Sequence, residues 1–427
     1  MNVNAVKRRI LWVSNHTPFL TDFGGGQRSS LIYRALRSFG EIDVLLVCPA
    51  HASGRTVEQT HGKPEGLMEI VEPLKRGEFL PWKLIRGLAP ALVDKIAYNL
   101  GRREMDYARD PKVGTVLDRM LGERPYDLIV GRHLKYLSKA GALNYTPTII
   151  DVDDNELDLY RLIIEDRNTG WLRRAVLKER VKTLARIVPN LMAQCSGLWV
   201  SKEEDRRIPG CERAAVLPNI PYGLASSNPT GLLAPSPNTK VILFVGMLSY
   251  IYNAQGIATF LADAWPAIRQ AHPDAIFRLV GSRLSEQDRE RWAQVPGVQV
   301  VGYVEDLRDA YRDCTFVVVP IWSGGGTNIK VPEALMHGRT CVISRPAHRG
   351  YTNVLLDGES LLVGGSSREI AGHCIELLQN PQRCATLAER GAAMVAKVFS
   401  FDSFSKVVTH TVEQALRNGG NIKMRKS

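Results

Sequence analysis

The sequence predicts an α/β fold made of two parallel-sheet domains joined by a linker, and three observations support this prediction. At 427 residues the chain is too long for one compact core and long enough for two ordinary domains. Strand-like runs of apolar and β-branched residues alternate with amphipathic helical segments in both halves, which is typical of βαβ units. Residues 218–240 are dense in Pro, Gly, Ser and Asn and follow neither period, as a linker does.

Composition indicates a globular protein without a membrane-spanning helix. The chain is 44% hydrophobic and 23% charged, and it has no apolar run of about 18 residues. It begins with a short basic stretch that leads directly into a strand-like run, so we expect no signal peptide and a cytoplasmic location. Seven scattered cysteines form no CxxC pair, and we expect them to be buried free thiols.

The net charge of +11 lies mostly in the first half, because residues 1–220 carry seven more basic than acidic side chains. Such a surplus suits nucleic acid, an anionic membrane surface or an anionic acceptor. Aromatic and basic residues do not interleave in a recognisable motif, so we expect no nucleic-acid partner. The basic amphipathic segment 81–100 either rests on the inner face of the cytoplasmic membrane or packs on the core.

The segment from Pro320 to Gly338, PIWSGGGTNIKVPEALMHG, carries the strongest functional signal. It follows an apolar, β-branched run typical of a buried parallel strand. Its three consecutive glycines let backbone N–H groups approach a ligand closely, and Pro332 is expected in the first turn of the next helix. A glycine-rich entry into a helix suits a phosphate. Lys330 adds a positive charge, and Glu333 adds a carboxylate able to hold two vicinal hydroxyls.

This segment, with the strand-like TCVIS that follows it, resembles the nucleotide-sugar motif of retaining glycosyltransferases of family 4, whose two-domain fold is called GT-B. The family's usual motif has two glutamates eight positions apart. Glu333 matches the second, whereas Gly325 stands in place of the first. The resemblance implies that backbone amides of Gly325, Gly326, Thr327 and Asn328 replace the missing carboxylate. The alternative is the strand-to-helix joint of an ordinary Rossmann-like domain.

A second glycine-rich loop, GGGQRS, follows the first predicted strand near the N-terminus. It lacks the GxGxxG spacing, and no acidic residue ends the next strand, so NAD binding is disfavoured. The resemblance implies that Gly25 and Gly26 approach the donor diphosphate and the transferred sugar. The alternative is a tight strand-to-helix turn.

Five further polar residues are predicted at the carboxyl edge of the first sheet, where open α/β sheets bind ligands. Arg132 and His133 end one strand, and the resemblance implies that His133 binds the donor sugar. A surface histidine without function is the alternative. His16, on the first loop, is a second candidate. Asp153 and Asp154 end the following strand, where they bind a metal, hold acceptor hydroxyls or cap a helix; acceptor contacts or capping are favoured.

In the second half, Gly246 ends a strand and opens a loop that the resemblance brings close to the donor phosphates. The family often has an Arg or Lys shortly after this glycine, but GMLSYIYN supplies none, which leaves Lys330 as the main cation. The resemblance also implies that backbone atoms near Tyr303 and Val304 hold the nucleotide base.

The domain boundaries follow from these patterns and from the resemblance. We expect two Rossmann-like domains facing across a cleft in the GT-B manner, with the last helix crossing back to the first domain. The expected limits are an acceptor-binding domain at 1–220, a linker at 221–239, a nucleotide-sugar-binding domain at 240–399, a cross-over helix at 400–418 and a disordered basic tail at 419–427.

The resemblance implies a hexosyl- or related glycosyltransferase that moves a sugar from a nucleotide diphosphate to a glycan or lipid-linked acceptor. It further implies retention at the anomeric carbon, a role in bacterial surface or extracellular polysaccharide synthesis, and no metal or cofactor. His133 and Lys330 are the expected catalytic residues, because the departing diphosphate needs its negative charge stabilised. Two alternatives stay open: a nucleotide-sugar epimerase of the same fold, and a nucleotide-sugar-binding protein with weakened catalysis.

Overall fold

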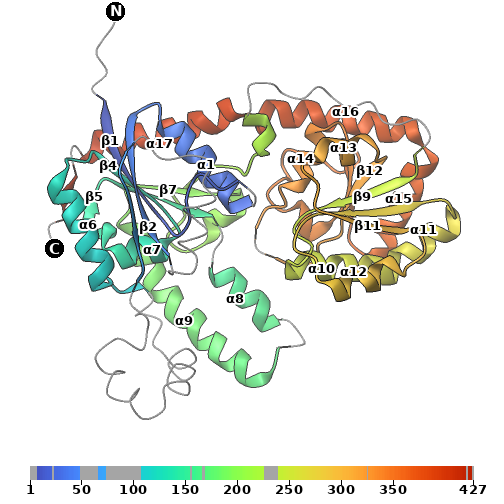
Figure 1. Cartoon of the computed structure of the whole chain (residues 1–427), viewed down its shortest axis with the longest axis horizontal. Helices are drawn as coiled ribbons and strands as arrows, with labels where there is room; N and C mark the ends of the chain where they lie inside the picture. Colours follow the sequence, from blue (N-terminus) through green and yellow to red (C-terminus); the bar gives the residue numbers. More distant parts are fainter. Residues whose placement is uncertain are drawn as a thin grey trace, which may run out of the picture. The chain divides into compact units, whose positions relative to one another are not determined.

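The chain forms two compact units, which we describe separately (Figure 1). The first consists of residues 1–217 and 405–427, and the second of residues 218–404. The predicted boundary near residue 220 and the predicted return of the chain's end to the first domain agree with this division. The computed structural model describes residues 7–21, 24–48, 66–73, 107–153, 156–165, 169–225, 239–324, 326–419 and 422–425. The basic segment 81–100 and most of the expected linker therefore lie outside the described residues.

The first unit is built on a seven-stranded sheet in the order β3-β2-β1-β4-β6-β7-β8, in which every neighbouring pair is parallel. The central strands are buried on both faces, which is why they read in the sequence as nearly continuous apolar runs. The strands are β1 (Arg8–Ser14), β2 (Gly40–Val47), β3 (Met68–Val71), β4 (Leu128–Arg132), β6 (Thr148–Asp153), β7 (Gly197–Val200) and β8 (Ala215–Val216).

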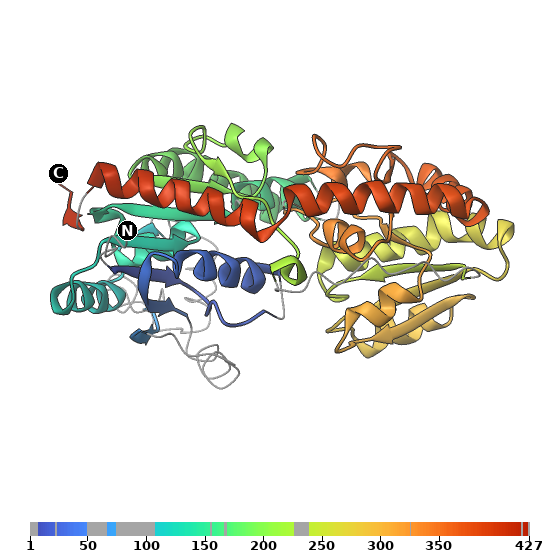
Figure 2. The same ribbon diagram turned by 90° about the horizontal axis from the view of Figure 1, so that it is seen from above.

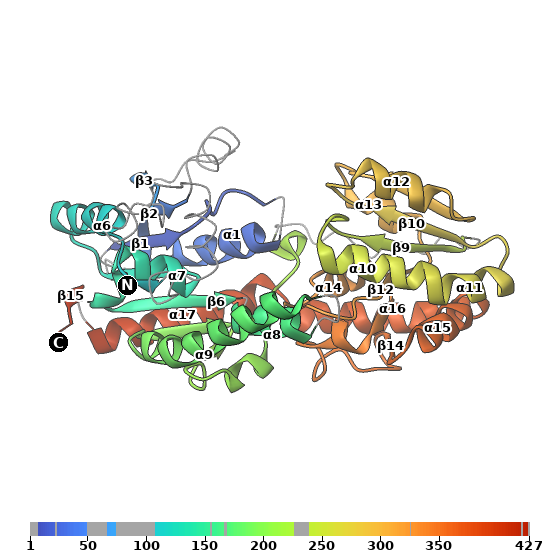
Figure 3. The same ribbon diagram turned by 90° about the horizontal axis from the view of Figure 1, so that it is seen from below.

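Helices cover both faces of this sheet (Figures 1 and 3). Helix α1 (Gly24–Leu36) and the C-terminal helix α17 (Phe401–Gly419) lie on one face, and α6 (Pro111–Glu123) and α7 (Leu134–Ala140) lie on the other. Figure 2 shows α17 in red along its face. There the indole N–H of Trp199 on β7 donates to Thr411 Oγ1 on α17 over 3.0 Å. This hydrogen bond ties the returning chain end to the sheet.

Helices α8 (Glu156–Glu165) and α9 (Trp171–Ala193) follow β6 and pack against each other. The 23-residue α9 buries only four side chains, all in its later turns from Leu177 onward. Its first residues, Trp171 and Leu172, are 80% and 62% exposed. The start of α9 therefore presents apolar side chains that the described residues do not cover.

The second unit contains a six-stranded parallel sheet in the order β11-β10-β9-β12-β13-β14. Its strands are β9 (Val241–Val245), β10 (Ile276–Val280), β11 (Val298–Gly302), β12 (Phe316–Val319), β13 (Cys341–Ser344) and β14 (Leu362–Gly364). Figure 1 shows one face covered by α13 (Leu307–Arg312), α14 (Lys330–Met336) and α16 (Pro381–Val398). The other face carries α10 (Ile251–Thr259), α11 (Trp265–Ala271), α12 (Glu286–Ala293) and α15 (Ser367–Gln379).

One local prediction needs correction. The tail from residue 419 was expected to be disordered, but Lys423–Met424 (β15) pairs antiparallel with Tyr145–Thr146 (β5). The pairing is extended by two backbone bonds, from Ile422 N to Tyr126 O and from Arg425 N to Asn144 O. The polar composition of the tail hid this pairing, because the bonds use only main-chain atoms.

The cysteine prediction is confirmed, since all seven cysteines are buried and free. Among the described residues, no helix combines the length and the apolar character that a membrane crossing requires.

Candidate functional site

The predicted donor-binding residues of the second unit meet at the carboxyl edge of its sheet, where β9 and β12 are neighbours. The chain leaves β9 toward β10 on one side and leaves β12 toward β13 on the other. Such a switch point is where open parallel sheets bind ligands, because the two following loops diverge there. The Gly246 loop follows β9, and the segment 320–329 follows β12. The fold therefore brings together two loops that are about 80 residues apart in sequence.

Lys330 is the buried cation of this edge. Its side chain is 8% exposed, and its Nζ donates to Asn253 Oδ1 over 2.8 Å. Nζ also lies 4.5 Å from the ring centroid of Phe244, a cation–π distance. Burial lowers the pKa of Lys330 to about 7, and the nearby Glu333 only partly opposes this. The permanent charge expected from the sequence is thus replaced by an amine that is half protonated near neutral pH.

Gly246 makes room for this lysine. Its φ is +154°, in a region that residues with a side chain rarely adopt. A Cβ at this position would lie 3.2 Å from Lys330 Nζ and 3.1 Å from Asn253 Nδ2. Asn253 in turn donates to Met247 O over 2.8 Å, so it links the loop to the lysine. The predicted proximity of Gly246 and Lys330 is therefore present, with Asn253 as an unforeseen third member.

Glu333 lies on α14 and is held by a residue that the sequence did not single out. The hydroxyl of Tyr311, a fully buried residue on α13, donates to Glu333 Oε2 over 3.0 Å. Burial raises the pKa of Glu333, while the bond from Tyr311 and the charge of Lys330 act in the opposite direction. No sequence motif marked Tyr311, because its role depends on the packing of two helices.

The glycine-rich loop is fixed from two sides. Gly324 has a φ of +124°, and its carbonyl accepts a 2.7 Å hydrogen bond from Arg349 Nη2. Thr327 Oγ1 accepts a 2.7 Å hydrogen bond from Asn219 Nδ2. Gly326 is exposed and Asn328 is half-buried, whereas Gly325 lies outside the described residues. Lys330 opens α14, so Pro332 stands in the first turn as predicted.

The residues predicted to hold the base follow β11, near the outer edge of the same sheet. Tyr303 is 73% exposed and Val304 is half-buried. The ring of Tyr303 is thus open to solvent, and its contact with a base stays a prediction.

In the first unit, the predicted sugar and acceptor residues converge at the carboxyl ends of β1, β4 and β6. Arg132 is fully buried and donates from Nη1 to Ser29 Oγ over 2.7 Å and also to Gly25 O. From Nη2 it bonds Asp153. His16 Nε2 lies 2.9 Å from Ser29 Oγ and 3.4 Å from Gly25 O. One buried guanidinium thus connects the first loop, the start of α1 and the end of β6.

Arg28, which sequence reasoning did not assign, and Asp151, one of the clustered carboxylates expected at the end of this strand, complete this cluster. Arg28 on α1 donates to both carboxylate oxygens of Asp151, with its shortest contact at 2.7 Å. Arg132 Nε lies 3.1 Å from Asp151 Oδ2, and Arg28 Nη1 donates to Leu217 O over 2.8 Å. Two arginines and two aspartates therefore balance each other, which favours a positioning role for Asp153 over metal binding. Asp154 lies outside the described residues.

His16 and His133, the two histidines of this cluster, are neutral at physiological pH. Burial lowers the pKa of His16 to about 3, and the charge of Arg132 adds to this effect. Burial and Arg132 likewise lower the pKa of His133 to about 4. The ring centroids of His16 and His133 are 6.2 Å apart. Burial alone would raise the pKa of Asp153, but Arg132 and Arg28 lower it, so this carboxylate is ionised.

His133 has a φ of +59°, and its backbone N–H donates to Asp151 O over 3.1 Å. A positive φ in a residue other than glycine costs free energy that the surrounding structure must supply. The turn directs the chain from β4 into α7, and His133 occupies the position before the first residue of that helix. Strain of this kind gathers at functional sites, which agrees with the predicted role of His133.

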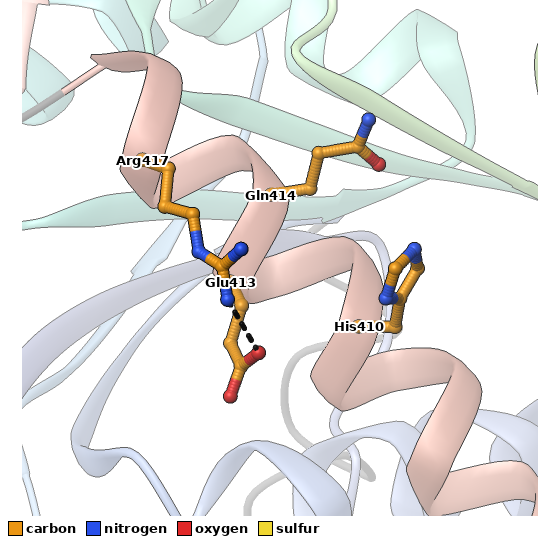
Figure 4. A pocket seen from close by; sticks show the side chains of 4 residues that line it. All are labelled: His410, Glu413, Gln414 and Arg417. Carbon is orange, nitrogen blue, oxygen red and sulfur yellow. Dashed lines mark hydrogen bonds and ion pairs between the residues drawn. The ribbon is translucent and has the colours of Figure 1, made fainter.

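A surface hollow of about 310 Å³ lies along α17, lined by His410, Glu413, Gln414 and Arg417 (Figure 4). All four are exposed on one stripe of the helix, and Arg417 pairs with Glu413 at 3.4 Å. The hollow contains none of the predicted residues. In the described part of the chain, no group of three or more His, Cys, Asp or Glu side chains is arranged to hold a metal ion.

Comparison with known protein families finds a match within the second unit. Residues 239–380 match the family described as Glycosyl transferases group 1. The match includes Gly246, Lys330 and Glu333 and covers less than half of the chain. No curated protein matches the sequence.

Comparison with solved structures covers nearly the whole chain. The structure is similar to HepE of Anabaena in complex with UDP and glucose, with a TM-score of 0.61 and 17% identity over 95% of this chain and 99% of that one. Sucrose-phosphate synthase of Thermosynechococcus elongatus gives a TM-score of 0.65 and 15% identity over 96% of this chain and 99% of that one. TarM gives a TM-score of 0.63 and 9% identity over 96% of this chain and 99% of that one. These likenesses show the fold, two parallel-sheet domains of the GT-B kind, as the sequence predicted.

Proposed function

We propose that the protein is a glycosyltransferase that uses a nucleotide diphosphate sugar as its donor. The observation that carries this proposal is the environment of Lys330. A buried amine stands at the switch point of a parallel sheet, next to a glycine whose missing side chain makes room for that amine. It lies within the segment that matches the glycosyl transferases group 1 family. HepE, which has a similar fold, was solved with UDP-glucose, so a nucleotide sugar is the natural donor class to test.

The chemistry follows from the charges of this edge. Breaking the bond between sugar and diphosphate leaves negative charge on the diphosphate, and a cation close to it stabilises that charge. A diphosphate beside Lys330 favours its protonated form, so the ligand itself restores the charge that burial removes. Asn253 keeps the amine oriented at 2.8 Å. We assign diphosphate stabilisation to Lys330 and binding of the ribose hydroxyls to Glu333.

The first unit supplies neutral hydrogen-bonding groups. His133 has a pKa of about 4, so at pH 7 it meets a sugar hydroxyl as an uncharged imidazole. We propose that it orients the transferred sugar, with retention at the anomeric carbon and without a metal. Both carboxylates near it, Asp151 and Asp153, are bound by arginines, which supports a reaction without a metal held there.

The test begins with thermal-shift screening against UDP-, GDP- and ADP-sugars, followed by assays of donor hydrolysis and transfer. Lys330→Ala should lower turnover at least about 100-fold, as expected when a group that stabilises developing charge is lost. The matched control is Lys240→Ala, which removes an exposed lysine that pairs with Asp274 at 2.9 Å. This control should keep normal turnover. Near-normal turnover in Lys330→Ala would refute the assignment.

The same assays separate the two alternatives. An epimerase would interconvert donor sugars in the absence of any acceptor, which chromatography detects. The glycine at position 325, in place of the expected glutamate, is the feature that favours a binding protein with weakened catalysis. That alternative requires donor binding without hydrolysis or transfer above background.

We further propose that the protein is cytoplasmic and transfers sugar to a glycan or lipid-linked acceptor for bacterial surface or extracellular polysaccharide, at an anionic membrane surface. Helix α9 supports the membrane contact. It carries six basic residues against one acidic residue, and it begins with the exposed Trp171 and Leu172. Amphipathic helices with basic polar faces bind anionic lipid in this way.

Vesicle sedimentation tests this contact. The protein should bind phosphatidylcholine vesicles that contain an anionic lipid, and less so those of phosphatidylcholine alone. Trp171→Ser with Leu172→Ser should weaken binding, whereas Leu356→Ser, at a side chain 43% exposed in the second unit, should not. Equal binding by the two variants would exclude α9 as the contact.

A further inference from the structure

Glu333 lies on α14, and His337, the residue that caps the C-terminal end of this helix, follows about one helical turn later. Tyr311 of α13 contacts both. Its ring stacks on the imidazole of His337, with centroids 4.5 Å apart and an interplanar angle of 18°, while its hydroxyl donates to Glu333 Oε2. A single aromatic side chain thus spans one turn of α14 and ends at the carboxylate.

Tyr311 is itself held firmly. Its carbonyl accepts a 2.7 Å hydrogen bond from Nε of Arg339, and the same guanidinium donates to Arg312 O over 3.0 Å. Tyr311 and Arg339 are both fully buried. Arg339 therefore fixes the C-terminal end of α13, and the ring of Tyr311 has little freedom to move away from α14. The hydroxyl has a fixed position with respect to Glu333.

Within the described residues, Tyr311 is the only side chain that donates a hydrogen bond to Glu333, and it uses Oε2. The other oxygen, Oε1, accepts no hydrogen bond from a described side chain. A carboxylate with one oxygen fixed and the other available can accept from the two hydroxyls of a vicinal diol. This arrangement matches a ribose ring.

We propose that Tyr311 is a positioning residue for Glu333, which it holds so that the carboxylate binds the 2′- and 3′-hydroxyls of the donor's ribose. The inference rests on the proposed function, because it requires a nucleotide at this edge of the sheet. It adds a specificity: the site selects a ribonucleotide over a 2′-deoxyribonucleotide through a carboxylate set by a buried tyrosine.

The charged state of Glu333 supports this role. The ionisable groups that act on it are Tyr311 on α13 and Lys330 on its own helix, while the buried thiols of Cys314 and Cys341 act on Tyr311. Burial raises the pKa of Glu333, and the Tyr311 hydroxyl lowers it. Loss of the hydroxyl should raise that pKa further. Binding that needs the carboxylate should then fail at a higher pH in the variant.

The test is calorimetric titration of the wild type and Tyr311→Phe with UDP, GDP and ADP, and then with the 2′-deoxy form of the tightest binder. The substitution keeps the ring on His337 and removes one oxygen atom. Affinity for the ribonucleotide should fall roughly tenfold to a hundredfold, the worth of a hydrogen bond to a charged group. Affinity for the 2′-deoxy form should change much less, and the acid limb of ribonucleotide affinity should move to higher pH.

Two further variants make the result specific. Tyr126→Phe is the matched control, because it removes another buried tyrosine hydroxyl, bonded to Asp43 at 2.7 Å in the first unit. It should leave nucleotide affinity and its pH profile unchanged. In a Glu333→Gln background, Tyr311→Phe should have little additional effect on affinity.

The outcomes distinguish a failure of the proposed function from a failure of the role assigned to Tyr311. If the wild type binds none of the nucleotides, the proposed function is overturned and this inference with it. If the wild type binds and Tyr311→Phe keeps the same affinity, deoxy discrimination and pH profile, the positioning role is overturned while the proposed function stands. Equal losses for the ribo and 2′-deoxy forms would show a general packing effect and would also overturn it.

Discussion

The buried amine of Lys330 should make donor binding depend on pH in a direction that the structure determines. Burial lowers the pKa of Lys330 in the free protein to about 7. A bound diphosphate favours the ammonium form and raises this pKa toward its ordinary value. Binding should therefore take up protons, and affinity should fall as pH rises through the pKa of the free protein.

The magnitude follows from the two protonation states. With a pKa of about 7, roughly half of the lysines are charged at pH 7 and about one in eleven at pH 8. If only the charged form binds the diphosphate, affinity should fall about fivefold from pH 7 to 8 and about tenfold from pH 8 to 9. Proton uptake on binding should grow from about 0.5 at pH 7 to about 0.9 at pH 8.

Calorimetry of UDP binding in buffers with different ionisation enthalpies measures both quantities. Asn253→Asp should displace the fall in affinity to higher pH, because it adds a carboxylate where an amide oxygen now lies 2.8 Å from Nζ. Lys330→Met should bind weakly and without this pH dependence. An affinity that stays constant from pH 7 to 9, with heats independent of the buffer, would refute the reasoning.

Three further outcomes are expected from the first unit. Arg28→Met should lower the free energy of unfolding by about 3–5 kcal/mol in urea titrations, since it leaves buried Asp151 with one guanidinium, whereas Arg8→Met at the exposed pair with Asp127 should cost at most about 1 kcal/mol. Because the pKa of His133 is lowered to about 4, turnover should not follow an imidazole titration at pH 6 to 7; a step there that disappears in His133→Asn would contradict the neutral assignment. Thr411→Val should cost about 1 kcal/mol, because it leaves the indole N–H of Trp199 without its acceptor, and an unchanged melting temperature would count against that hydrogen bond.

The fold was predictable because the spacing of apolar residues distinguishes strands from helices, and glycine-rich loops mark where these elements end. Buried strands such as β1 and β12 read as continuous apolar runs, and glycine-rich loops mark where they enter helices. The short strand pair at the C-terminus was not predicted, because it has no such pattern in its side chains. The pairing of Lys423–Met424 with Tyr145–Thr146 uses only main-chain bonds, which leave no side-chain pattern to read.

The loop residues of the site were predictable from the sequence, whereas the side chains that form hydrogen bonds to them were not. Gly246 and Lys330 each stand in a recognisable strand-to-loop context, so both could be named from the sequence. Asn253 and Tyr311 could not, because each acts through a contact between elements far apart in sequence. The lowered pKa of Lys330 was also hidden, since it results from burial that only the tertiary structure creates.

The two units differ in whether their buried charged side chains have partners of opposite charge. This difference indicates where a charged ligand would add stability. In the first unit, Arg28 and Arg132 are paired with Asp151 and Asp153, so that cluster is electrically complete. In the second unit, no carboxylate of the described residues lies within ion-pair distance of Lys330, whose partners are an amide oxygen and an aromatic ring. An isolated buried amine lowers stability unless a ligand compensates for it. An anion beside Lys330 would recover that free energy, whereas one beside the paired arginines would gain little, so we expect a diphosphate to bind in the second unit.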